Sequence, residues 1–133
     1  MDFLSYFLDN LLGFCNRGGC NMALIRLMYD DLVQLPFEVH NEYNLSETEL
    51  FKHGKGDCED KAPVLARYMI RNGRKCVKLL YMRSVDESEP GHVVVLHDGF
   101  VYDPTMGYWR YPDWNYKSMM KSYKDFEERN VFW

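Results

Sequence analysis

The chain has 133 residues, of which 47% are hydrophobic and 27% charged, and its formal net charge is -4. This length fits one domain, and the composition is typical of a globular protein rather than a disordered one. No run of lysines or arginines stands out among the 16 basic residues, and nucleic-acid binding needs clustered positive charge. We therefore expect a single domain over residues 1–133, without a nucleic-acid partner, in which residues 1–21 are a candidate N-terminal helical extension.

Residues 3–14 place their apolar side chains at helical spacing and predict an amphipathic helix that ends near Gly13. Its polar face carries no basic residue, whereas a helix lying on a membrane usually does. We expect this helix to pack on the core or on a partner chain, which leaves an oligomer open. Asp2 and Asp9 interrupt the apolar stretch, and no segment has the ~18 apolar residues of a membrane span. The sequence thus predicts no membrane span and a cytoplasmic location with reduced thiols.

Cys15 and Cys20 flank a predicted loop, residues 16–21, at C-x4-C spacing. Structural zinc usually requires closer spacing and a second pair of ligands, and His40 and His53 are not spaced as such a pair. A zinc protein is the weakest of the functions considered, and we expect no metal or cofactor.

The remaining elements predict an α+β fold in which helices pack on an antiparallel sheet. Helices are expected over residues 22–34, 47–53, 58–71 and 115–128, and strands over 77–83, 93–96 and 100–102. Ser46 and Glu49 form a capping box for the second helix, and Asp98-Gly99 is a preferred two-residue hairpin turn. Pro63 lies inside the third helix, which is therefore expected to become regular only near Asp60.

Cys58 lies at the predicted N-terminus of that third helix. The unpaired backbone N–H groups of a helix N-terminus favour a thiolate, which is the form of cysteine that attacks, and they can also hold an oxyanion. The commoner role of a lone cysteine is that of a small buried apolar residue. Cys58 by itself therefore does not decide between a nucleophile and a core residue.

His92 and Asp103 make the nucleophile more plausible. A two-residue turn at Asp98-Gly99 pairs Val94 with Asp103, and side chains alternate along a strand, so Asp103 faces the same side as His92. A three- or five-residue loop without a bulge would reverse that parity. Cysteine, histidine and aspartate are the residue types of a nucleophile, a base and an orienting acid. The proximity of Cys58 to this pair does not follow from periodicity.

The segments GDCEDKA (56–62), LARYMIRNG (65–73), GHVVV (91–95) and DGFVYDPT (98–105) resemble the transglutaminase-like superfamily. The GDCED form is closest to the bacterial transglutaminase-like cysteine proteinases, and the resemblance spans about residues 44–105. It implies a papain-like core in which Cys58 is the nucleophile, His92 the general base and Asp103 the orienting acid. The family's second oxyanion donor is not evident, and Gln34, Asn41 and Tyr43 are the upstream candidates.

Three functions follow from this resemblance. The first is hydrolysis of peptide or isopeptide bonds in a protein or peptide substrate, through a thioester acyl-enzyme and without a cofactor. The second is transglutaminase-type acyl transfer, which needs the same three residues. The third is a catalytically silent papain-like binding module.

Several other residues have structural explanations. We expect Cys76 in the core, His97 exposed beside the turn, and Glu59 and Asp60 as helix caps. The aromatic tail could line a substrate groove, although core packing is its more usual role; its members are Tyr108, Trp109, Tyr111, Trp114 and Tyr116.

Overall fold

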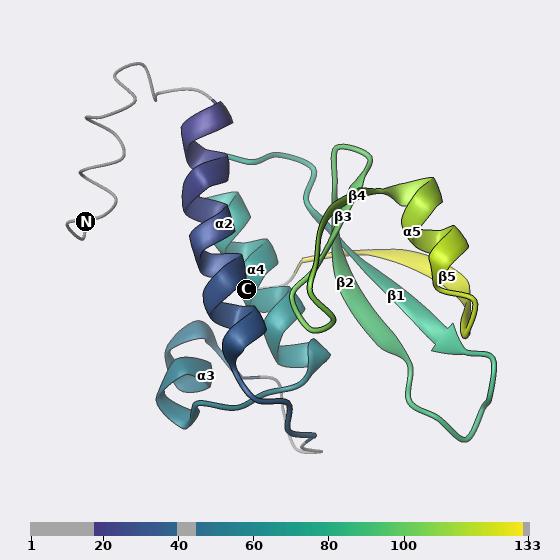
Figure 1. Cartoon of the computed structure of the whole chain (residues 1–133). Helices are drawn as coiled ribbons and strands as arrows, with labels where there is room; N and C mark the ends of the chain where they lie inside the picture. Colours follow the sequence, from purple (N-terminus) through teal and green to yellow (C-terminus); the bar gives the residue numbers. More distant parts are fainter. Residues whose placement is uncertain (1–17, 40–44, 132–133) are drawn as a thin grey trace.

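The computed structural model describes residues 18–39 and 45–131 (Figure 1). Within them the helices are α2 (Gly18–Gln34), α3 (Glu47–His53), α4 (Cys58–Arg71) and α5 (Asp113–Met119). The strands are β1 (Lys78–Ser84), β2 (His92–His97), β3 (Phe100–Asp103), β4 (Tyr108–Pro112) and β5 (Tyr123–Asn130). The strands form one five-stranded antiparallel sheet in the order β4-β3-β2-β1-β5. The predicted α+β class is confirmed.

Both faces of the sheet are covered, which forms three layers. Helices α2 and α4 pack over one face, where Ile25, Leu65 and Val95 belong to one buried cluster. Helix α5 covers the other face, where Tyr116 and Val94 belong to a second cluster (Figure 1). All six residues of β2 are therefore buried, which explains why the strand reads as a continuous apolar run rather than an alternating one.

The hairpin between β2 and β3 has the predicted register. His97 pairs with Phe100, Leu96 with Val101, and Val95 with Tyr102. The two turn residues, Asp98 and Gly99, have φ values of 53° and 79°, as a type I′ turn requires. The prediction that Asp103 faces the same side of the sheet as His92 assumed a two-residue turn, and this turn is confirmed.

The N-terminal turn of α4 differs from the prediction based on Pro63. The helix begins at Cys58, not near Asp60, and Pro63 is accommodated inside it. A capping box explains the early start, because the Asp57 side chain accepts from the Asp60 N–H while the Asp60 side chain accepts from the Asp57 N–H. Asp60 is thus part of the cap, as predicted, whereas Glu59 is exposed at the surface.

The C-terminal segment is where the sequence prediction was wrong. Instead of a helix over 115–128, a short α5 ends at Met119 and β5 follows. β5 pairs with the outer edge of β1, which would otherwise present unpaired backbone groups. Strand β4, which the sequence did not predict, pairs with the far edge of β3. Pairing at the two edges of the sheet makes these segments strands, and no local sequence pattern predicts that pairing.

Three smaller expectations are also corrected. Helix α2 begins at Gly18, inside the predicted loop, because packing against α4 outweighs the low helix propensity of glycine. Cys76 is exposed with φ 58° ahead of β1, rather than in the core. His97 is buried at 9% exposure, since it is the last residue of a strand covered on both faces.

Some expectations concern residues outside the described ones. They are the helix over residues 3–14, the side chains of Cys15, Cys20 and His40, and the candidates Asn41 and Tyr43. In residues 18–39 and 45–131 no helix has both the length and the apolar character to cross a membrane.

Candidate active site

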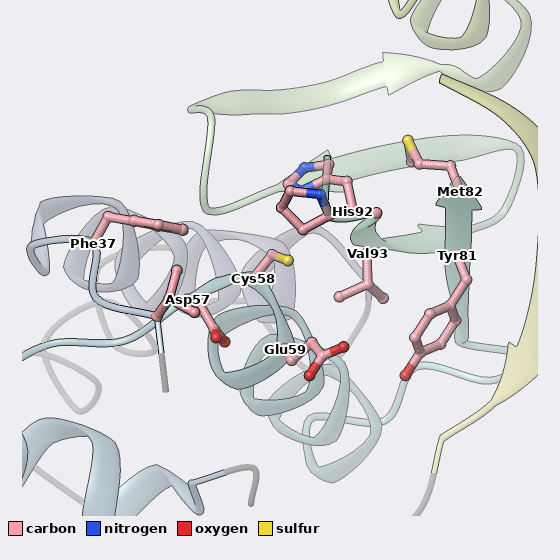
Figure 2. Close-up of a pocket in the computed structure, with 11 residues that line it drawn as sticks. Phe37, Asp57, Cys58, Glu59, Tyr81, Met82, His92 and Val93 are labelled. Atoms are coloured by element: carbon pink, nitrogen blue, oxygen red, sulfur yellow. The ribbon is translucent and has the colours of Figure 1, made fainter. Parts of the chain in front are cut away.

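Cys58 is the first residue of α4, where the capping box holds the helix start in place. Gly56, two residues before Cys58, leaves little room for a side chain. A Cβ there would lie 2.5 Å from Leu50 Cδ1 and 3.0 Å from Asp60 Oδ2. The Cys58 side chain is half-buried and lines a cavity of about 270 Å³ (Figure 2). The thiol therefore combines a helix N-terminus with access from solvent, which are the conditions for a reactive cysteine.

His92 begins β2 and is 6% exposed. Its Nε2 lies 2.9 Å from Oδ2 of Asp103, the last residue of β3. The Cys58 side chain lies beside this ring at the cavity and contributes to the raised pKa of His92 (Figure 2). The imidazole thus joins the thiol to the carboxylate.

Asp103 is fully buried and accepts four hydrogen bonds. The backbone N–H groups of Thr105 and Met106 donate to Oδ1 at 3.0 and 2.9 Å. The Tyr116 hydroxyl donates to Oδ2 at 2.8 Å, alongside His92. Donors on both oxygens stabilise the ionised carboxylate and fix its orientation.

The protonation of His92 follows from these contacts. Burial by itself lowers the pKa of an imidazole, but the hydrogen bonds to Asp103 and Cys58 outweigh it and raise the pKa of His92 from 6.5 to about 9. The ring of Tyr123 packs beside it at a centroid distance of 5.7 Å. At neutral pH His92 is therefore an imidazolium, which is the form that stabilises a neighbouring thiolate.

A second buried cation lies one turn into α4. The Lys61 side chain is 2% exposed, and its ammonium donates to the carbonyl oxygen of Leu35 at 2.7 Å. Burial lowers the pKa of Lys61, and the charges of Asp103, Asp57 and Asp60 oppose that shift. Lys61 thus links the end of α2 to α4 and places a positive charge near three carboxylates.

The structure brings together three of the residues expected at the site, Cys58, His92 and Asp103. Gln34 is exposed and does not line the cavity. The aromatic tail does not line it either: within that tail Trp114 is 75% exposed, and Tyr116 is fully buried against Asp103.

The sequence analysis missed Tyr116 and Lys61 as neighbours of these three residues, and Phe37 and Val39 as walls of the cavity. The available signal for Lys61 was the position of a lysine in the first turns of a helix whose neighbouring side chains are buried. Nothing in the local sequence marks the other three.

Among the described side chains, no group of three or more His, Cys, Asp or Glu residues is placed to hold a metal ion. His53, considered as a zinc ligand, instead pairs through Nε2 with Glu38 at 2.9 Å.

Comparison with known proteins gives a result at the level of the fold. No family model matches the chain, and no curated protein matches it. The calcium-bound structure of Legionella pneumophila LapG resembles it with a TM-score of 0.66 and 17% identity, over 93% of this chain and 72% of LapG. EGTA-treated LapG gives 0.64 and 17%, over 83% and 63%. A further LapG structure gives 0.63 and 16%, over 84% and 66%. These similarities show that the chain shares its α+β fold with LapG.

Proposed function

We propose that this protein is a cysteine-dependent hydrolase of peptide or isopeptide bonds, with Cys58 as nucleophile, His92 as general acid and base, and Asp103 as the orienting acid. The observation that carries the proposal is the imidazole of His92, which lies 2.9 Å from the buried Asp103 carboxylate and beside the Cys58 thiol at the cavity. The fold-level relationship to LapG, a transglutaminase-like cysteine protease, supports the same class of activity.

In the first half of the reaction, the Cys58 thiolate attacks the carbonyl carbon of the scissile amide and forms a C–S bond. The carbonyl electron pair moves to oxygen, and we propose that backbone N–H groups at the start of α4 stabilise the oxyanion. As the oxyanion collapses, the C–N bond breaks and His92 gives its proton to the leaving amine. The products of this step are a thioester and a free amine.

In the second half, neutral His92 takes a proton from water, and the resulting hydroxide attacks the thioester carbon. The C–S bond then breaks and releases the carboxylic acid and the thiolate, while the imidazolium is restored. Asp103 keeps the ring in one orientation through both steps and stabilises its charged form. Nε2 is bound to Asp103, so Nδ1 is the nitrogen that faces the thiol.

The test is the pH dependence of iodoacetamide labelling, read by mass spectrometry of the individual cysteines. Cys76 is exposed and serves as an ordinary thiol within the same molecule. We expect Cys58 to label well below pH 8 and faster than Cys76, and His92→Ala to remove that advantage while circular dichroism shows a folded chain. Equal labelling of both thiols at every pH, indifferent to His92, would rule out the catalytic assignment.

A further inference from the structure

One wall of the cavity is an extended segment held beside the nucleophile. Phe37 forms a parallel bridge with Gly56, two residues before Cys58. The Glu38 N–H donates to the Gly56 carbonyl, and the Gly56 N–H donates to the Pro36 carbonyl, both at 3.1 Å. The backbone of this segment is thus fixed relative to the thiol.

Side chains alternate along an extended segment. Phe37 and Val39 both line the cavity, whereas Glu38 points away and pairs with His53 at 2.9 Å and Lys55 at 3.5 Å. Phe37 and Val39 are 60% and 61% exposed, and they belong to a small group of large apolar residues at the surface. These two side chains, which we call the apolar wall, face the cavity from a backbone that is hydrogen-bonded beside Cys58.

The rest of the lining matches the wall in polarity. Tyr81, Met82, Val93 and Pro90 contribute apolar surface on other sides of the cavity. The charged groups are the carboxylates of Asp57 and Glu59 together with His92, and no lysine or arginine is among the lining residues. The cavity therefore favours an apolar group and disfavours an anion.

The position of the wall decides which part of a substrate would meet it. His92 must reach the leaving amine, so the leaving group lies on the His92 side of the thiol. In Figure 2 Cys58 lies between Phe37 and His92. The acyl side of the substrate therefore lies toward the apolar wall. A volume of about 270 Å³ is at the small end for ligand sites, which run from ~300 Å³ upward, and suits one or two residues.

We propose that the substrates carry an apolar side chain on the residue that supplies the scissile carbonyl, that this side chain packs against Phe37 and Val39, and that aspartate or glutamate at that position is rejected. This inference rests on the proposed cysteine hydrolase activity and adds its specificity.

The experiment uses N-acetyl-aminoacyl vinyl sulfones with leucine, glycine or aspartate side chains next to the electrophile. The Cys58 sulfur adds to the vinyl carbon β to the sulfone, which is bonded to the α-carbon that carries the side chain, and the carbon next to the sulfone takes up a proton. Loss of the unmodified protein, followed by intact mass, gives a second-order rate for each probe. Iodoacetamide, which is too small to use the wall, reports the reactivity of the thiol itself.

We expect the leucine probe to react about tenfold faster than the glycine probe, the low end for one apolar group in a fitted pocket, and the aspartate probe to be the slowest. Phe37→Ala should reduce the leucine rate to within about twofold of the glycine rate, with the iodoacetamide rate unchanged. Phe37→Leu should retain the preference. Trp114→Ala is the matched control, because Trp114 is an exposed aromatic residue that does not line the cavity.

Two failures are distinguishable. If Cys58 is no more reactive toward iodoacetamide than Cys76, the hydrolase proposal fails, and the specificity proposal fails with it. If Cys58 is reactive but the three probes react equally, or the leucine preference survives in Phe37→Ala, the apolar wall is not a substrate site and the hydrolase proposal stands.

Discussion

Tyr116 and His92 hydrogen-bond the same oxygen of Asp103, at 2.8 and 2.9 Å. One donor comes from α5 and the other from β2, so the carboxylate is held from both the helix layer and the sheet. Burial raises the pKa of the Tyr116 hydroxyl, and the Asp103 charge raises it further, which keeps Tyr116 a donor at every physiological pH. Tyr116 is therefore a positioning residue for the Asp103–His92 pair.

Tyr116→Phe removes one of the four donors on Asp103 while it leaves the ring in place. We expect a loss of stability of about 1.5–3 kcal/mol, the usual contribution of a hydrogen bond to a charged group, and slower iodoacetamide labelling of Cys58. Urea unfolding and labelling kinetics measure the two effects. Tyr108→Phe is the control, because Tyr108 pairs with Asp103 between β3 and β4 and its ring packs on Tyr116 at 6.0 Å, but none of the four hydrogen bonds to the Asp103 carboxylate comes from it. Equal effects of the two substitutions would contradict the positioning role.

The titration of His92 tests its coupling to Asp103. Its pKa is raised to about 9 from 6.5, so nuclear magnetic resonance of the ring should show a midpoint near 9. In Asp103→Asn the neutral amide no longer stabilises the imidazolium while burial still opposes it, so the midpoint should fall clearly below 9. An unchanged midpoint in this variant would show that Asp103 does not set the charge of His92.

The same shift makes stability depend on pH. The pKa of His92 is higher in the folded chain than in the unfolded chain, so its contribution is fully present below pH 6.5 and is lost as the pH rises through about 9. We expect the free energy of unfolding to fall by about 3 kcal/mol at most over that interval. Asp103→Asn should flatten the fall, and a wild-type stability that rises between pH 6.5 and 9 would contradict the assignment.

Two substitutions of Asp57 distinguish the effect of its hydrogen bond at the start of α4 from the effect of its negative charge. Asp57→Ala should cost about 1 kcal/mol, because the Asp60 N–H loses its side-chain acceptor. Asp57→Asn keeps a side-chain oxygen and should retain most of the stability. Thermal unfolding compares the two variants. If Asn destabilises as much as Ala, the charge of Asp57 matters rather than its cap.

Lys61 tests whether the buried ammonium stabilises the site. Lys61→Met keeps the length of the side chain but leaves the Leu35 carbonyl without its donor and removes one positive charge near three carboxylates. We expect a loss of about 1–3 kcal/mol in urea unfolding. Lys52→Met, on the exposed surface of α3, should change stability by less than about 0.5 kcal/mol. A neutral or stabilising Lys61→Met would show that burying the charge costs more than its contacts return.

The sequence by itself determined the elements whose signals are local. The Ser46 capping box set the start of α3, and the Asp98-Gly99 turn set the register of β2 and β3. Side-chain alternation across that turn then placed Asp103 on the side of His92, where the hydrogen bond is found. Each of these inferences uses neighbours within about a dozen residues, over which backbone geometry is nearly fixed.

Only the tertiary structure decided how Cys58 meets His92. His92 shares a strand face with Val94, which α5 covers, whereas α4 packs on the opposite face. The thiol and the imidazole therefore meet at the end of the sheet, and the packing of α4 determines whether they touch. Tyr116 reaches Asp103 because α5 packs on the face of the sheet that carries Val94 and Val101. Contacts of this kind depend on packing between layers and on edge pairing, which are properties of the assembled sheet and helices rather than of any segment.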